Sequence, residues 1–405
     1  MLDDIAYKDY KKKEDIHGTI LYPAVMVAPV QKDILSELIA RKGITSVFDP
    51  FYGSGTALYE AMEISQDLHL VGCDINPLAH LITKVKLQGV NSQIYEDFNK
   101  LKNLIEVPRQ IFPLSFPNMD KWFRKDIIES LTILRSAIIQ IENFQNRLFF
   151  WYMLCDVIRK YSNTRSSTYK LHIKVDEVIS RMENGVIKSF LSAVELNIDK
   201  FFHRSNNFVL YKCDTLAKMS EFDDREFDIS ITSPPYGENA TTVPYGQFSM
   251  LALYTIPQND LELEGWELDN YSVIDSNSMG GKNSNGILND FENTLLEPYL
   301  NRISITKHKK VTRFFADYFL FLKQLCRVTN KYIVLTLGNR TVDRVQIDLT
   351  EITKVFLEAN NFLNTKSASR EIPIKRTPKL TSKVHQTPVL SMNHEYIVIH
   401  ERKNQ

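Results

Sequence analysis

The segment of this sequence with the clearest chemical potential is a hydrophobic run, residues 228–236, that ends in two prolines and a tyrosine. Proline has no amide donor and a fixed φ, so the chain must leave a central strand at this point. Ser233 offers a hydroxyl acceptor, Pro234 offers a carbonyl that no strand ladder uses, and Pro235 stiffens the turn before the flat face of Tyr236. These groups suit a planar heterocycle that carries an amino group, and stacking on the tyrosine would contribute about 1–3 kcal/mol.

A second segment joins an expected strand to an expected helix through two glycines, Gly53 and Gly55. Glycine is needed where the backbone takes a positive φ, or where a ligand leaves no room for a Cβ. The next expected strand ends in Asp74, 21 residues after Gly53. A Rossmann-type fold offers a carboxylate to ribose hydroxyls at about this spacing.

The glycine pattern bears on the kind of ligand. A nicotinamide dinucleotide would call for a third glycine at position 58, where this chain has Leu58. S-Adenosylmethionine has no phosphate, so fewer glycines suffice. A purely structural turn explains the two glycines nearly as well, but the acid at the right distance favours a ligand.

Together these segments resemble the amino-methylating DNA methyltransferases, which make N4-methylcytosine or N6-methyladenine. The resemblance rests on Asp49-Pro50-Phe51-Tyr52-Gly53-Ser54-Gly55-Thr56, Asp74-Ile75-Asn76-Pro77 and Thr232-Ser233-Pro234-Pro235-Tyr236, in the order of the family's non-permuted members. It implies a catalytic turn of Ser233, Pro234, Pro235 and Tyr236. It also implies S-adenosylmethionine-binding residues, which are Tyr22, Pro23, Asp49, Pro50, Phe51, Gly53, Gly55, Thr56, Asp74, Ile75, Asn76 and Asp214.

The resemblance implies a mechanism based on positioning. Ser233 Oγ and the Pro234 carbonyl would accept hydrogen bonds from the target amine and localise its lone pair towards the methyl group, about 3–3.5 Å away. The partner would be double-stranded DNA with the target base flipped out of the stack. Beyond the turn, Tyr245 or Phe248 could wall the base pocket and Gln247 could fill the vacated stack, although these residues could equally belong to the core.

Several functions remain open at this stage. Serine at the first catalytic position favours cytosine N4, with adenine N6 as the alternative, and the absence of a Pro-Cys dipeptide argues against carbon-5 methylation. We expect a site-specific enzyme of a restriction–modification or related defence system, with a possible partner restriction endonuclease. The competing interpretations are an RNA or protein-amide methyltransferase of the same fold and a non-catalytic nucleic-acid-binding protein.

The elements that must position these residues follow an α/β pattern. We expect strands at 46–49, 69–74, 208–213, 227–232, 332–337, 362–369 and 395–400, and helices at 29–40, 56–64, 312–328 and 350–359. The sequence therefore predicts a Rossmann-like, seven-stranded methyltransferase sheet whose last two strands form an antiparallel hairpin.

Two stretches interrupt this alternation. Residues 1–90 would form the first part of the catalytic domain and residues 206–405 the second part. Residues 91–205 are expected to be a mainly helical insertion with a possible role in target recognition. Residues near 237–310 are rich in Asn, Ser and Gly and are expected to form a loop insertion.

Composition limits the possible partners. The chain has 405 residues with 49 Lys and Arg against 49 Asp and Glu, so its net charge gives no overall attraction to nucleic acid. Phosphate contact would then need local patches. The candidates are one cluster of Arg302, Lys307, His308, Lys309, Lys310 and Arg313, and another of Lys366, Arg370, Lys375, Arg376, Lys379 and Lys383.

The remaining features predict an ordinary cytoplasmic protein. Four cysteines lie far apart with no CxxC pair, so we expect reduced thiols and no metal site. The N-terminus is charged and has no signal-peptide pattern. The longest apolar run, residues 148–155, is too short to cross a membrane.

Overall fold

The computed structural model describes residues 7, 9–41, 43–202, 207–237, 243–263, 272–281, 285–371 and 394–403. Its centre is a seven-stranded sheet in the order β3-β2-β1-β4-β5-β9-β8. The strands are β1 (Ser46–Asp49), β2 (His69–Asp74), β3 (Phe208–Lys212), β4 (Phe227–Thr232), β5 (Thr329–Leu337), β8 (Phe362–Glu371) and β9 (His394–Arg402). The predicted fold class is confirmed.

The pairing explains why these strands could be predicted. Strands β3, β2, β1, β4 and β5 run parallel, and β9 lies antiparallel between β5 and β8. Every residue of β1 and β4 is buried, so both faces of these strands are covered. The antiparallel pairing of the last two strands is likewise confirmed.

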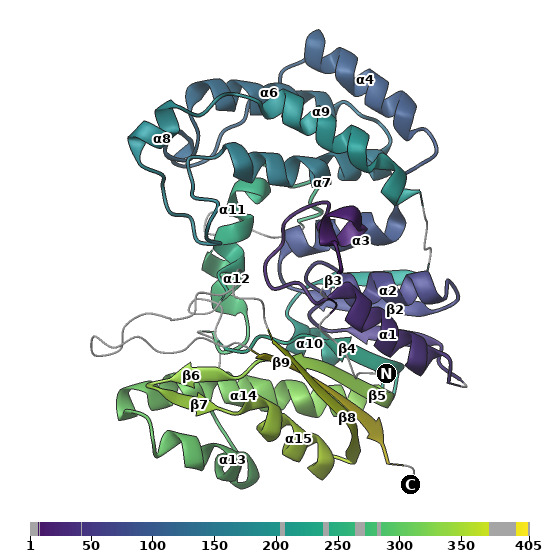
Figure 1. The fold of residues 1–405 in the computed structure, drawn as a ribbon, viewed down its shortest axis with the longest axis vertical. Helices are drawn as coiled ribbons and strands as arrows, with labels where there is room; N and C mark the ends of the chain where they lie inside the picture. The colour runs from purple at the N-terminus through teal and green to yellow at the C-terminus, as the bar shows by residue number, and fades with distance from the viewer. Residues whose placement is uncertain are drawn as a thin grey trace.

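Helices cover both faces of the sheet, each over its own apolar core (Figure 1). One face carries α1 (Ala28–Ile39), α2 (Thr56–Ile64) and α3 (Pro77–Gln88), and the other carries α10 (Thr215–Met219), α14 (Ile305–Val328) and α15 (Leu349–Ala359). The parallel strands thus end along one edge, where loops from both layers meet.

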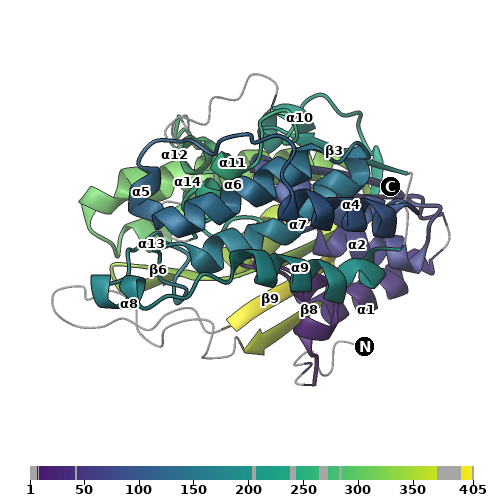
Figure 2. The same cartoon turned by 90° about the horizontal axis from the view of Figure 1, so that it is seen from above.

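The insertion predicted to be helical is helical. It contains α4 (Ile94–Glu106), α5 (Met119–Trp122), α6 (Lys125–Ile139), α7 (Phe144–Tyr161), α8 (Asp176–Ser180) and α9 (Val186–Asn197). Figure 2 shows these helices lying together over the rest of the molecule. The apolar core of the insertion is continuous with the core under α1–α3. Trp151 Nε1 and Arg147 Nη2 both donate hydrogen bonds to the carboxylate of Asp260, which lies outside the insertion.

The expectation of a loop-rich stretch near 237–310 is wrong for the described residues. They contain α11 (Tyr245–Thr255), α12 (Ser272–Asn277), α13 (Asp290–Leu300) and the first turns of α14. Helix α11 is almost wholly buried and therefore lacks an amphipathic pattern, while α13 carries Pro298 in its interior and starts at a capping box of Asn289 and Glu292. The burial of α11 and the internal proline of α13 hide the helical period of these two segments.

A short hairpin was also not predicted. Strands β6 (Arg340–Val342) and β7 (Val345–Ile347) have three residues each and are joined by Asp343 and Arg344, both at positive φ. Runs of three residues are too short to show a period of two. Among the described residues, no helix is long and apolar enough to span a membrane.

Candidate active site

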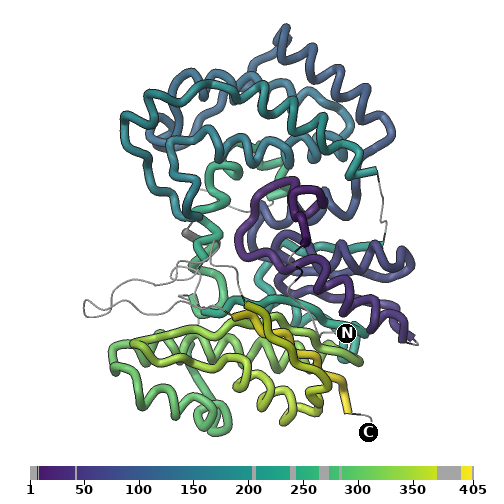
Figure 3. The backbone as a smooth tube through the Cα atoms, in the orientation of Figure 1, coloured from purple at the N-terminus to yellow at the C-terminus, as the bar shows by residue number. Residues whose placement is uncertain are grey.

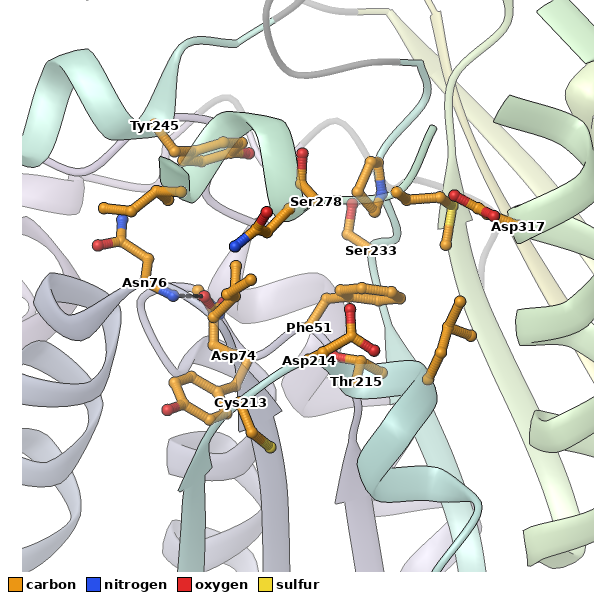
Figure 4. Close-up of a pocket in the computed structure, with 18 of the residues that line it drawn as sticks. Phe51, Asp74, Asn76, Cys213, Asp214, Thr215, Ser233, Tyr245, Ser278 and Asp317 are labelled. Carbon is orange, nitrogen blue, oxygen red and sulfur yellow. Dashed lines mark hydrogen bonds between the residues drawn. The ribbon is translucent and has the colours of Figure 1, made fainter. Parts of the chain in front are cut away.

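The two motif turns open into one cavity of about 1280 Å³ at the carboxyl end of the parallel strands. Gly53 and Asp74 line it from β1 and β2, and Ser233 and Pro235 line it from the end of β4 (Figure 4). The volume exceeds the roughly 300–1,000 Å³ of a pocket for one drug-sized ligand. The cavity is therefore large enough for a nucleoside-sized cofactor together with a second ligand.

The glycine turn is held by hydrogen bonds with Asp74 and Thr83. Gly53 and Gly55 have φ values of 51° and 70°, the left-handed region that favours glycine. Gly53 N donates to Asp74 Oδ2 at 2.9 Å, and Thr83 Oγ1 donates to Gly53 O at 3.1 Å. A Cβ on Gly55 would lie 2.6 Å from Thr83 Cγ2, so the turn and α3 fit only with glycine there.

Asp74 is the acid predicted at the end of β2, and it lines the cavity. Its Oδ1 accepts from Asn76 N at 2.8 Å, while Oδ2 accepts from Gly53 N. Burial raises the pKa of Asp74 to about 6, against the two backbone hydrogen bonds, which lower it. Each carboxylate oxygen has lone pairs beyond these bonds, so the group can still accept hydrogen bonds from hydroxyls.

Asn76 ties this acidic loop to the N-terminal segment. Its Nδ2 donates to Tyr22 Oη at 3.1 Å and to Ser249 Oγ at 2.8 Å. The Tyr22 ring lies against Tyr245, with centroids 5.9 Å apart. Tyr22, Asn76 and Tyr245 all line the cavity, together with the predicted Pro23 and Ile75. No sequence motif pointed to Ser249, which is a buried residue of α11.

Phe51 and Asp214 form another wall of the cavity (Figure 4). The Phe51 ring packs edge-on against Phe321 of α14, with centroids 5.1 Å apart. The Asp214 side chain caps α10, because its Oδ1 accepts from Ala217 N at 2.8 Å. An exposed aromatic face beside a carboxylate suits a heterocycle that bears an amino group. Thr56 also lines the cavity, as expected.

Three residues expected at the cofactor do not line the cavity: Asp49, Pro50 and Gly55. Asp49 is fully buried, and burial raises its pKa to about 7. Its Oδ1 accepts from Phe51 N at 3.1 Å, and the Pro50 carbonyl accepts from Thr215 Oγ1 at 2.7 Å. These residues support the glycine turn without lining the cavity.

The catalytic turn has a directed hydrogen-bond chain. Tyr236 Oη donates to the Thr336 carbonyl at 3.3 Å and lies 3.0 Å from Ser233 Oγ. Because the tyrosine proton is engaged, Ser233 must donate its own proton to Tyr236, which leaves the serine lone pairs for an incoming donor. Ser233 and Pro235 line the cavity, whereas Pro234 and Tyr236 do not.

Tyr245 lines the cavity, whereas the ring of Tyr236 packs against the core under α14. Phe248 is buried beside Arg159 and Tyr169, and Gln247 Oε1 accepts from Leu171 N at 3.3 Å. The sequence did not single out the cavity residues of α12 and α14, which include Asn277, Ser278, Asp317, Leu320 and Lys323.

Comparison with known proteins agrees with this geometry. The chain is 28% identical to the Type II methyltransferase M.MvaI of Kocuria varians over 93% of this chain and 88% of that protein. It is 24% identical to the Type II methyltransferase M.BsoBI of Geobacillus stearothermophilus over 56% of this chain and 50% of that protein. No model of a protein family matches the chain, and neither does any solved structure.

The chain is similar to DNA methyltransferases over nearly its whole length, and it is an enzyme of that kind. The relatives at this level of identity are Type II methyltransferases. Three of its cysteines are buried, and the fourth, Cys213, lines the cavity beside Asp214. No group of His, Cys, Asp and Glu among the described residues could hold a metal ion.

Of the two basic clusters, the first lies on the methyltransferase surface. Arg302, Lys307 and Lys309 are exposed around the start of α14, whose later turns reach the cavity at Asp317. In the second cluster, Lys366 pairs with Glu37 at 3.3 Å and Arg370 pairs with Glu395 at 2.6 Å. Its other members, Lys375, Arg376, Lys379 and Lys383, lie outside the described residues.

Proposed function

We propose that this enzyme transfers a methyl group from S-adenosylmethionine to the exocyclic N4 amino group of cytosine in double-stranded DNA. The observation that supports this proposal most directly is the shared cavity of the glycine turn, Asp74 and Ser233. A methyl donor and a planar amine can meet there without crossing the sheet.

The residues present fit the cofactor. Asp74 would accept from the ribose hydroxyls, as carboxylates at this position do in Rossmann-type folds. The adenine would lie on Phe51 with its amino group towards Asp214, and Tyr22 and Pro23 would close over the methionine end. When bound, S-adenosylmethionine supplies an electrophilic methyl group on a sulfonium.

The target amine would be activated by hydrogen bonds rather than by a strong base. Ser233 Oγ, which lines the cavity and whose proton is held by Tyr236, would accept an amine N–H. This bond localises the nitrogen lone pair, which in the free base is conjugated into the ring. The proton released after transfer passes to water.

The base must leave the duplex to reach Ser233, at a cost of a few kcal/mol. Tyr245, which faces the cavity, would stack on the flipped base. Serine rather than an acid or amide at position 233 favours cytosine N4 over adenine N6. The relatives' designation as Type II methyltransferases supports a site-specific enzyme paired with a restriction endonuclease.

Nucleoside mass spectrometry tests this proposal. DNA and RNA are digested from cells that express the wild-type enzyme or Ser233→Ala, and methylated nucleosides are quantified. We expect 4-methylcytosine in DNA from the wild type and a loss of that mark in the variant. A rise of N6-methyladenine alone would move the target to adenine, and a mark confined to RNA, or no mark, would refute DNA cytosine methylation.

A further inference from the structure

A chain of three buried ionisable residues lies beneath the glycine turn, outside the cavity. His17, Glu60 and Lys86 have exposed fractions of 3%, 5% and 2%. They come from the N-terminal segment, from α2 and from α3, respectively. Figure 3 shows the N-terminal segment (dark purple) running close to these helices, below the insertion.

The hydrogen bonds of this chain have a defined direction. Lys86 Nζ donates to the Ser54 carbonyl at 2.8 Å and lies 3.3 Å from His17 Nδ1. An ammonium can only donate, so Nδ1 accepts and the ring proton is on Nε2. His17 Nε2 then donates to Glu60 Oε1 at 2.8 Å. The result is a relay from ammonium through neutral imidazole to carboxylate.

Burial shifts the pKa of each of these three residues. Burial, together with the neighbouring Lys86, lowers the pKa of His17 well below its ordinary value, which keeps the imidazole neutral. Burial also lowers the pKa of Lys86 to about 7 and raises the pKa of Glu60 to about 7. The Glu60 carboxylate raises the pKa of Lys86 against the effect of burial and so favours its ammonium form.

A buried lysine is costly to desolvate, and this one directs a hydrogen bond to the backbone of the turn. Thr83, three residues earlier on α3, holds the preceding carbonyl, that of Gly53. Residues three apart share one face of a helix, so one face of α3 fixes two consecutive peptide planes. Gly53 and Ser54 both line the cavity on the other side of the turn.

We propose that Lys86 is a positioning residue for the cofactor: the Lys86–His17–Glu60 chain fixes the Ser54 carbonyl and so holds the glycine turn in the shape that binds S-adenosylmethionine. This inference rests on the proposed function. It assigns a role to the N-terminal segment, because His17 supplies the link between Lys86 and its counter-charge. Cofactor binding thus depends on residues that never touch the cofactor.

The test compares Lys86→Met with Lys84→Met, measuring the Kd of S-adenosylmethionine and S-adenosylhomocysteine by calorimetry and KM and kcat on DNA. Lys84 is a matched control, because it is on the same helix but bonds Glu262 instead. We expect Lys86→Met to raise Kd and the cofactor KM about tenfold or more, with a smaller change in kcat, because a hydrogen bond to a charged group is lost. Lys84→Met should bind the cofactor like the wild type.

A merely structural role has a different signature. It would lower the urea midpoint of Lys86→Met while the folded variant kept the wild-type Kd, and that result would overturn the inference. If Lys86→Met does not fold, Glu60→Gln serves instead, because the amide oxygen still accepts from His17 but the counter-charge is gone. Glu60→Gln should raise Kd several-fold, and an unchanged Kd would contradict the proposal. Failure of the wild type itself to bind the cofactor would instead refute the proposed function.

Discussion

Replacing Gly55 by alanine tests the fit between the glycine turn and α3. The new Cβ would lie 2.6 Å from Thr83 Cγ2, 2.7 Å from its Oγ1 and 3.0 Å from its Cβ. Thr83 is fully buried and β-branched, so its side chain has little freedom to withdraw. It would also lose its hydrogen bond to Gly53 if it rotated.

The expected cost has two parts. An alanine at the left-handed φ of 70° costs about 1–2 kcal/mol. Overpacking against Thr83 adds about 1–3 kcal/mol. We therefore expect Gly55→Ala to lower the free energy of unfolding by about 2–5 kcal/mol and to weaken cofactor binding, because relief of the clash must move the turn.

Gly53→Ala is the matched control. Position 53 also has a positive φ, of 51°, but its Cβ would meet Tyr22 Cε1 at 3.5 Å and the Phe51 carbonyl oxygen at 3.9 Å, both ordinary contact distances. Its cost in stability should therefore be limited to about 1–2 kcal/mol from the backbone conformation.

Urea denaturation of Gly53→Ala, Gly55→Ala, Thr83→Ala and the Gly55→Ala/Thr83→Ala double variant measures these terms. The double variant removes Cγ2 and Oγ1, so it should be more stable than the sum of the single variants implies, by about 1–3 kcal/mol. If the two costs simply add, or if Gly55→Ala is no worse than Gly53→Ala, the close approach of the turn to Thr83 is refuted.

Three further outcomes are expected. Tyr236→Phe removes the acceptor of the Ser233 proton, so the single-turnover rate of methyl transfer should fall about 2- to 10-fold while the cofactor Kd stays unchanged. A raised cofactor Kd with a normal rate would contradict this role of Tyr236. The pKa of Asp74 is about 6, and under the proposed function its ionised form accepts hydrogen bonds from the ribose hydroxyls of S-adenosylmethionine. The Kd of S-adenosylmethionine, measured by calorimetry, should therefore rise about tenfold for each pH unit below 6. Asp74→Asn should lose that slope, and a slope that persists in the variant would assign the effect to another group. Lys307→Gln with Lys309→Gln should reduce the slope of log K for DNA against log salt by about 2, and an unchanged slope would remove α14 from the DNA contact.

The sheet could be predicted because its central strands are buried on both faces. The predicted bounds of β1, β2 and β4 agree with the structure, and these strands end at Asp49, at Asp74 and before Ser233. The shared cavity of the two turns was likewise predictable, since ligands collect beyond the carboxyl ends of parallel strands.

Other parts of the site could not be predicted, because they depend on side-chain direction. Nothing in the motif indicates that the Tyr236 hydroxyl bonds Thr336 while Tyr245 faces the cavity. Asp49 has the same residue type as Asp74 and the same place at a strand end, yet it points into the core. Lys86, which lies between Val85 and Leu87 on a helix, cannot be distinguished in sequence from a solvated lysine.

The insertion between β2 and β3 shares its apolar core with the layer under α1–α3, and Trp151 and Arg147 anchor it to Asp260. Deleting the insertion would expose α3, the helix that carries Thr83 and Lys86, to solvent. The insertion therefore cannot be exchanged as a whole without exposing that helix. Substitutions, whether in evolution or in the laboratory, should accumulate on the insertion's outer face, with its inner face kept apolar.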